Sequence, residues 1–395
     1  MLTAREFLWG LLWSLPWIVF PLVAVLRQRR SVSLSSYDAS PTVPNAARVS
    51  IILPARNEAE HIAACVDSLR KTTWSNVEII VVNDHSTDGT RELAQRAAKG
   101  DNRVMIVDAP DLPTGWFGKQ WACHSGMQHA TGSLLLFTDA DTRHSPDLVA
   151  RLVHARESRR ADLMSVAGSQ AMLSFWERAI QPAVFAILLA RYGGTQEIEN
   201  ARRPVDVIAN GQCFLITRDA YDTIGGHESV KDTVAEDLMI GQRTRAAGFK
   251  VSLVLGTEHL STRMYDGFGT IVRGWMKNVY AGGRLSMPGG VLGRLIFPLA
   301  LVGGPLSVVA PFIVGLILLP LGIRGAAISP TLAAWCIIST VALLWFFSAI
   351  NDFARTAQWR VVFVPIGMIV FAGICLAAVV RGQNVEWKGR TYRAS

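Results

Sequence analysis

Four stretches of the chain are apolar over enough residues to cross a lipid bilayer as helices. A helix needs about 20 apolar residues to span the ~30 Å hydrocarbon core. Hydrophobic residues make up 50% of the chain and charged residues only 18%, a low share for a wholly soluble protein. We therefore expect a multi-pass membrane protein with one large polar block. The four stretches are residues 7–26, 295–323, 328–350 and 361–380.

The first stretch predicts the orientation of the chain. It is too long for the apolar part of a signal peptide, and it ends in Arg27, Arg29 and Arg30 without a small-residue cleavage site. We interpret it as a signal anchor in the cell (inner) membrane. The positive-inside rule then puts the following block in the cytoplasm. The second stretch contains several Pro and Gly residues, so it either spans or is re-entrant, and the side of the basic tail stays open.

These stretches divide the chain into an anchor (1–30), a linker (31–47), a soluble block (48–283) and a membrane region with a basic tail (284–395). The net charge of +8 invites a nucleic-acid interpretation. No Lys/Arg-dense stripe with interleaved aromatic residues is present, however, so we expect no nucleic-acid partner. The five cysteines are scattered, which argues against a disulfide framework or a zinc site.

The soluble block alternates short β-branched runs with helical patterns. Such alternation predicts an α/β domain with a mostly parallel sheet. Ligands bind outside the carboxyl ends of the strands in such sheets, so functional residues should follow the strands. The predicted strands are 49–53, 77–82, 104–107 and 134–138, and the predicted helices are 60–70, 90–98 and 119–130.

Carboxylates do follow two of these strands. Asp84 comes after the second, and Asp139 and Asp141 come after the fourth. Strand alternation would direct the side chains of Asp139 and Asp141 to the same side, where two carboxylates repel one another unless a cation lies beside them. Mg²⁺ or Mn²⁺, which also bind substrate phosphates, suit oxygen ligands of this kind.

Two further motifs allow alternative interpretations. Glu236 and Asp237 begin a predicted helix. They either stabilise it by interacting with the helix dipole or place a general base near the site. Arg273 and Trp275 lie close together, so they are either an interfacial anchor or a cation and an aromatic wall for the ligands.

The ordered motifs resemble the membrane-associated glycosyltransferases of family 2, which have the GT-A fold with a Rossmann-like, mostly parallel sheet. The likeness is greatest to bacterial carotenoid-acid and hopene-associated lipid glycosyltransferases, whose tail is similar to residues 387–392. The motifs are PARNE (54–58), VVNDHSTDGT (81–90), GWFGKQWA (115–122), DAD (139–141), AED (235–237) and RGWMKN (273–278).

The resemblance implies a role for each matching residue. Pro54, Ala55 and Glu58 would hold the base and ribose of a nucleotide-sugar donor. Asp84 would contact the base, and Lys119 would lie near the nucleotide. Asp139 and Asp141 would bind the donor and its divalent metal. Asp237, beside Glu236, would deprotonate the acceptor, and Arg273 and Trp275 would assist the leaving diphosphate and the acceptor.

The likeness also has a departure. Polymer synthases of the family carry a Q-x-x-R-W box, which Arg273-Gly-Trp275 lacks, so transfer of a single sugar fits better. An apolar segment at 176–192 is either an interfacial helix or a buried core helix. We expect an inverting, metal-dependent transferase that moves one sugar from a nucleotide-sugar donor, a UDP-sugar, to a membrane lipid. The alternatives are a polyprenyl-phosphate sugar synthase and a non-catalytic membrane scaffold with a relic nucleotide-binding fold.

Overall fold

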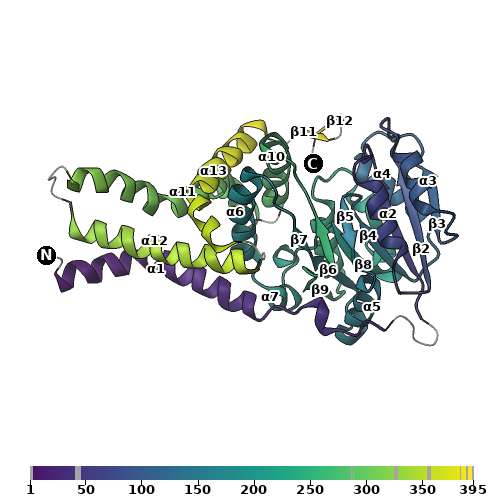
Figure 1. Cartoon of the computed structure of the whole chain (residues 1–395), viewed down its shortest axis with the longest axis horizontal. Coiled ribbons are helices and arrows are strands. Elements are labelled where there is room, and N and C mark those ends of the chain that lie inside the picture. Colours follow the sequence, from purple (N-terminus) through teal and green to yellow (C-terminus); the bar gives the residue numbers. More distant parts are fainter. Residues whose placement is uncertain are drawn as a thin grey trace. The chain divides into compact units, whose positions relative to one another are not determined.

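The computed structural model describes residues 3–40, 46–285, 287, 289–323, 328–353, 357–382, 384–387 and 390–393. The chain forms two compact units, and Figure 1 labels most of their helices and strands. The sheet unit comprises residues 31–171, 195–264 and 383–395, and the helical unit comprises residues 1–30, 172–194 and 265–382. This division differs from the predicted block 48–283, because residues 172–194 and 265–283 belong with the apolar helices.

A seven-stranded sheet in the order β3-β2-β1-β4-β8-β6-β9 forms the centre of the sheet unit. β1 pairs in parallel with both β2 and β4, β2 with β3, and β6 with β9, whereas β8 runs antiparallel to β4 and β6. The expected mostly parallel α/β sheet is thus confirmed. Its strands are β1 Val49–Ala55, β2 Val77–Asn83, β3 Val104–Asp108, β4 Leu134–Thr138, β6 Leu163–Ala167, β8 Cys213–Thr217 and β9 Val251–Leu255.

The register of the central strands brings their carboxyl ends to one edge. β1 pairs with β2 from Val49↔Val77 to Ala55↔Asn83, and the first four residues of β1 pair with β4. Every residue of β4 is buried, as are most residues of β1 and β2, because helices cover both faces of the sheet. The residues that follow these strands therefore come together at one edge.

The other elements of the sheet unit connect or flank these strands. A small three-stranded sheet of order β5-β10-β7 continues directly from the loop after β4. The helices are α2 Ile62–Arg70, α3 Thr90–Ala98, α4 Gly118–Met127, α5 Leu148–Arg159, α7 Thr195–Glu199, α8 Arg218–Thr223 and α9 Glu236–Ala246, with 3-10 turns η1 Leu34–Ser36, η2 Pro204–Asp206 and η3 Gly226–Val230. The short strands are β5 Thr142–His144, β7 Ser169–Gln170, β10 Leu260–Thr262 and the hairpin β11 Asn384–Trp387 and β12 Arg390–Arg393.

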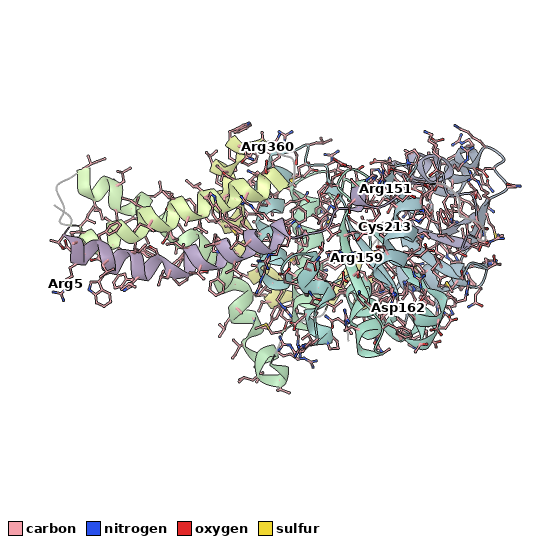
Figure 2. All side chains as sticks on the ribbon, turned by 90° about the horizontal axis from the view of Figure 1, so that it is seen from below. Arg5, Arg151, Arg159, Asp162, Cys213 and Arg360 are labelled. Carbon is pink, nitrogen blue, oxygen red and sulfur yellow. The ribbon has the colours of Figure 1, made fainter. Side chains whose placement is uncertain are left out.

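The first part of the predicted linker packs against α5. Leu34 is fully buried in the core of the sheet unit. Arg151, labelled in Figure 2, donates to the Ser35 carbonyl over 3.1 Å, and Arg159 donates to the Tyr37 hydroxyl. These bonds make residues 31–40 part of the sheet unit. Residues 41–45 of the predicted linker lie outside the described residues.

The helical unit contains four segments long and apolar enough to cross a membrane, which supports the predicted membrane association. The predicted stretch 295–323 lies in a single continuous helix in spite of its four internal prolines, so it does not form a re-entrant hairpin. The side of the membrane on which each end lies stays a prediction. The elements are α1 Ala4–Arg29, α6 Phe175–Tyr192, α10 Phe268–Leu285, α11 Gly290–Ile323, α12 Pro330–Phe353, η4 Gln358–Phe363 and α13 Val364–Arg381.

Helix α6 corresponds to the buried alternative for residues 176–192. It begins with a capping box between Ser174 and Glu177. Its middle residues are buried within the helical unit, and the backbone of α13 approaches so closely that a Cβ at Gly367 would lie 1.8 Å from the Ala179 carbonyl oxygen. The helix is therefore a packed member of this unit.

Candidate active site

The candidate site lies where the chain leaves β1, β2 and β4, at the shared carboxyl edge of the sheet. A small pocket opens here between the ends of β1 and β4, α4 and α9. Ligands of open α/β sheets bind at this edge. Residues that line the pocket include Pro54, Lys119, Asp139, Gly211, His227 and Glu236.

Lys119 joins two of the predicted carboxylates. Its Nζ lies 2.7 Å from Oδ1 of Asp139 and 2.7 Å from Oε1 of Glu236. Burial alone would lower the pKa of Lys119, but the charges of Asp139 and Glu236 raise it well above its ordinary value. The second residue of α4, the loop after β4 and the first residue of α9 thus form one ion cluster, which we call the Lys119 cluster.

Asp237 follows directly and is held by backbone groups. Its Oδ2 accepts a hydrogen bond of 2.6 Å from the Gly211 N–H, and its Oδ1 accepts one of 2.8 Å from the Leu238 N–H. Burial and the charge of Glu236 raise the pKa of Asp237 to about 6. An oriented carboxylate of this kind suits a general base near neutral pH.

Asp141 has the most strongly perturbed carboxylate of the site. Its Oδ1 is buried and has no hydrogen-bond partner among the described residues. Burial, then the charges of Asp139 and Glu58, raise the pKa of Asp141 to about 7. A hard divalent cation beside this oxygen would provide the missing partner and offset the repulsion between the carboxylates. Asp139 and Asp141 therefore fit the predicted metal.

A metal here would need ligands beyond these two residues. Among the described residues, no group of three or more His, Cys, Asp and Glu side chains is arranged to hold an ion. Mg²⁺ commonly binds one or two carboxylates together with substrate phosphates and water. The donor set therefore matches a cation that arrives with a phosphate ligand.

A buried polar network fixes the loop that carries the two aspartates. His144 Nε2 lies 2.9 Å from Thr138 Oγ1 and 3.3 Å from Thr142 Oγ1, and the Thr142 hydroxyl donates to the Asp139 carbonyl over 2.6 Å. Burial lowers the pKa of His144 to about 3, so its ring is neutral. The Thr138 hydroxyl also donates to the Gln212 carbonyl over 2.8 Å. This network ties both ends of the loop to one histidine.

The loops after β1 and β2 bind to each other. The Asp84 N–H donates to the Ala55 carbonyl over 2.8 Å, and the Glu58 N–H donates to the Thr90 hydroxyl over 2.8 Å. Both loops contain a non-glycine residue in the left-handed region, Asn57 at φ 51° and His85 at φ 53°. These contacts join the predicted base-binding residues into one surface.

Asp84 is almost fully covered by basic side chains. It is 1% exposed, and Arg390 of β12 reaches it with bonds of 2.7 and 3.2 Å to its two carboxylate oxygens. His85 Nδ1 lies 3.3 Å from Oδ1, and Arg56 Nη1 lies 3.9 Å from Oδ2. A nucleotide base in the predicted position would therefore meet an Asp84 carboxylate whose two oxygens already bind Arg390.

Comparison with known families decides the class of this sheet unit. Residues 50–225, which contain β1, β2, β4 and the Asp139–Asp141 loop, match the family described as "Glycosyl transferase family 2". The chain carries a glycosyl transferase family 2 domain at residues 50–225. It is therefore a glycosyltransferase, and the non-catalytic scaffold alternative is set aside.

Curated relatives of family 2 match beyond the sheet unit. A 4,4'-diaponeurosporenoate glycosyltransferase of Staphylococcus aureus (strain USA300) is 26% identical over 356 residues, which cover 88% of each chain. The Staphylococcus haemolyticus enzyme of the same name is 26% identical over 260 residues, which cover 65% of this chain and 67% of the relative. The predicted likeness to carotenoid-acid glycosyltransferases is confirmed as a distant one.

Solved structures are similar at lower identity. A mannosyltransferase from Pyrobaculum calidifontis, in complex with GDP-Man and Mn²⁺, is 18% identical with a TM-score of 0.49, covering 95% of this chain and 98% of that one. A glucosyl-3-phosphoglycerate synthase from Mycobacterium tuberculosis, in complex with Mn²⁺, UDP-glucose and phosphoglyceric acid, is 18% identical with a TM-score of 0.40, covering 60% of this chain and 81% of that one.

Within this family 2 chain, the structure gathers most predicted site residues in the sheet unit. Arg273 and Trp275 instead lie on α10 of the helical unit. Trp275 is 7% exposed, which is against the interpretation as an exposed interfacial anchor, and its Nε1 has no hydrogen-bond partner among the described residues.

The motifs missed several residues that hold the site. Gly211 positions Asp237, His144 and Gln212 hold the aspartate loop, and Arg390 covers Asp84. None of the first three lies in one of the six motifs. The likeness of residues 387–392 to related tails was the one available signal for Arg390.

Proposed function

We propose that this glycosyltransferase moves a single sugar from a nucleotide-sugar donor, a UDP-sugar, to a membrane lipid, with inversion at the anomeric carbon and with Mg²⁺ or Mn²⁺. The observation that carries the proposal is the Lys119 cluster with Asp237 beside it. One lysine between two carboxylates, next to a backbone-held base, suits a site that neutralises a leaving diphosphate and accepts a proton.

We assign donor binding to the residues that follow the carboxyl ends of the strands. Pro54, Ala55 and Glu58 would hold the base and ribose, and Lys119 would lie near the diphosphate. Asp139 and Asp141 would hold the metal together with the donor diphosphate. This agrees with Oδ1 of Asp141, which has no hydrogen-bond partner in the described part of the chain. When bound, a divalent cation supplies charge stabilisation for the leaving group.

The chemistry then needs one proton acceptor. In direct displacement, the acceptor oxygen forms a bond to the anomeric carbon while the bond from that carbon to the diphosphate oxygen breaks. The nucleoside diphosphate leaves with the bonding electron pair. The proton of the acceptor hydroxyl passes to the Asp237 carboxylate, whose two backbone hydrogen bonds keep it oriented.

The acceptor is assigned to the lipids because of the helical unit and the relatives. Four segments of this unit are apolar enough to cross a membrane, and two relatives are named for 4,4'-diaponeurosporenoate, a carotenoid acid. We assign Trp275 and Arg273 of α10 to the acceptor and the leaving group. The indole N–H of Trp275 has no hydrogen-bond partner among the described residues, which supports a role in binding.

The test uses the detergent-purified full chain with UDP-, GDP- and dTDP-sugars, with and without Mn²⁺ or Mg²⁺. Nucleotide release and lipid glycosylation are measured for the wild type, Asp141→Ala and Asp237→Asn. Asp222→Asn, at an exposed position on α8, is the matched control. We expect metal-dependent release of one nucleotide, lost in Asp141→Ala and retained in the control.

Acceptors of different acidity separate the remaining alternatives. Asp237→Asn should abolish transfer to a hydroxyl lipid, whereas a carboxylic-acid lipid is already ionised near neutral pH and should retain part of its rate. Preferred transfer to polyprenyl phosphate would contradict the proposed lipid transferase and support the polyprenyl-phosphate sugar synthase instead. If no nucleotide sugar binds under any metal condition, the proposed donor is wrong.

A further inference from the structure

The C-terminal strand β12 contacts the candidate site at two points. Arg390 forms its paired bonds with Asp84, which is 306 positions away in the sequence. Two residues on, the Tyr392 hydroxyl accepts a hydrogen bond of 3.2 Å from the Gly118 N–H at the start of α4. The strand therefore connects the end of β2 with the N-terminus of α4, all within the sheet unit.

The first contact makes Asp84 unsuitable as a free acceptor for a base. Its side chain is 2% exposed, and both of its carboxylate oxygens are bonded to the Arg390 guanidinium. A base N–H reaches this carboxylate only if Arg390 leaves. Removing Arg390 alone would leave a buried carboxylate with weaker partners, which is costly. The arrangement thus suits Asp84 as the residue that orients Arg390.

The charge around Asp84 favours an anion. One carboxylate is accompanied by the guanidinium groups of Arg390 and, at 3.9 Å, Arg56. These two guanidinium groups and the Asp84 carboxylate together carry a net positive charge. The Arg390 side chain is 20% exposed, and a guanidinium has five N–H donors, of which the bonds to Asp84 use two. A nucleoside diphosphate is an anion, so its charge is opposite to that of these guanidinium groups.

The second contact provides an aromatic surface beside the Lys119 cluster. The Tyr392 ring lies against Phe117, with ring centroids 4.2 Å apart and planes inclined by 32°. Phe117 precedes Gly118, the first residue of α4, and Lys119 is the second. Tyr392 is thus two residues in sequence from Arg390 and contacts the Phe117–Gly118 peptide, next to Lys119 in the chain.

We propose that Arg390 and Tyr392 are donor-binding residues that complete the nucleotide half of the site. Arg390, oriented by Asp84, binds the anionic and carbonyl oxygens of a nucleoside diphosphate, and the Tyr392 ring packs against the nucleotide. The inference rests on the proposed nucleotide-sugar donor. It assigns Asp84 a positioning role in place of the direct base contact expected from the motif.

The test measures binding of UDP in the presence of Mn²⁺ by calorimetry, with the full chain in detergent. Arg390→Ala should weaken UDP binding about tenfold or more, because a charge-assisted hydrogen bond to the anion is lost. Tyr392→Ala should weaken binding several-fold, and Tyr392→Phe should have a smaller effect because it keeps the ring. Arg96→Ala, at an exposed position on α3, is the control and should bind as the wild type does.

A double variant tests the positioning role of Asp84. Asp84→Asn should raise the donor KM while the acceptor KM stays the same. Adding Asp84→Asn to Arg390→Ala should weaken donor binding no further, because the two residues act through one guanidinium. If Arg390→Ala alone fails to fold, the double variant removes the uncompensated carboxylate and keeps the measurement possible.

Two results would overturn the inference. Unchanged UDP binding in Arg390→Ala and Tyr392→Ala would make β12 a structural strand only. Tighter binding would make it an obstruction that the donor displaces. Both differ from failure of the proposed function, in which the wild type itself binds no UDP-, GDP- or dTDP-sugar.

Discussion

A Cβ placed on Gly211 would lie 2.8 Å from Oδ2 of Asp237, the oxygen to which the Gly211 N–H donates. Gly211 lies between β6 and β8 in the chain, whereas Asp237 is the second residue of α9. The position of the proposed base therefore depends on the absence of a side chain at Gly211.

Gly211→Ala should reduce kcat while the fold is retained. The added methyl group would push the Asp237 carboxylate away from its backbone donor, and misplacement of a catalytic group by about 1 Å can cost about 100-fold in rate. We expect a loss of about 10- to 100-fold in single-turnover assays. Gly267→Ala, where an added Cβ meets no described atom within 4 Å, is the control. A variant with normal kcat would remove Gly211 from the site.

The rate of transfer to a hydroxyl acceptor should fall below a pH of about 6. Burial and Glu236 raise the pKa of Asp237 to about 6, so the carboxylate becomes protonated below that value and can no longer accept a proton. The rate should drop about tenfold per pH unit there. A pH series at saturating donor and metal measures this, and a flat profile down to pH 5 would exclude Asp237 as the base.

Lowering the pH should affect stability through Asp237 in the direction opposite to its effect on the rate. Its carboxyl holds its proton more tightly in the folded state than at its ordinary value, so between about pH 4 and 6 the folded state binds more protons than the unfolded state. This group therefore stabilises the fold more at the acidic end of that window. Thermal melting over the same pH range separates loss of rate from unfolding, since Asp237 lowers only the former.

Glu78→Gln should destabilise the sheet unit. The Glu78 carboxylate on β2 accepts bonds from the Ser50 hydroxyl, the Thr131 N–H and Arg48, at 2.5, 2.6 and 2.8 Å. Although burial opposes it, these bonds lower the pKa of Glu78 to about 2. Loss of the charged acceptor should lower the free energy of unfolding by about 1–3 kcal/mol at pH 7.

The effect of Glu78→Gln should depend on pH in a defined direction. A depressed pKa stabilises the fold above the ordinary value of about 4.5 and loses this effect as the pH falls toward 2. The difference between wild type and variant in denaturant unfolding should therefore shrink below pH 4. Glu92→Gln, at an exposed position on α3, should leave stability unchanged at both ends of the range.

His144→Leu should impair use of the metal. The neutral ring of His144 bonds to Thr138 and Thr142, which hold the loop of Asp139 and Asp141. We expect the Mn²⁺ concentration for half-maximal rate to rise several-fold, with partial rescue in His144→Gln, which retains hydrogen-bonding groups. Because the pKa of His144 is about 3, the ratio of wild-type to variant rates should be the same at pH 6.5 and 8.5. Unchanged Mn²⁺ dependence in His144→Leu would contradict the role.

Much of the fold was visible in local sequence patterns. The short apolar runs predict β1, β2 and β4 to within two residues, because a strand buried on both faces is largely apolar. Helix α3 was predicted with its observed ends. The antiparallel β8 was not predicted, since its direction depends on pairing between β4 and β6 rather than on its own residues.

The candidate site was predictable where single residues carry charge. Asp139 and Glu236 are predicted site residues because they are acidic and lie at the ends of elements. Their shared contact with Lys119 forms only in the folded chain, where three elements meet. Gly211 and His144 carry no local mark of their role. The bond from Arg390 to Asp84 joins positions 306 residues apart, which no spacing rule reveals.

The order in which the chain builds its two units has a consequence for synthesis. Residues 172–194 belong to the helical unit, yet they lie between β7 and α7 of the sheet unit, and the chain passes between the units after residues 30, 171, 194, 264 and 382. The ribosome therefore synthesises α6 before β8 and β9, so the central sheet is completed only after this helix of the helical unit has been made. A truncated protein spanning residues 48–283 would carry the apolar α6 without α12 and α13, and aggregation during expression is the expected result.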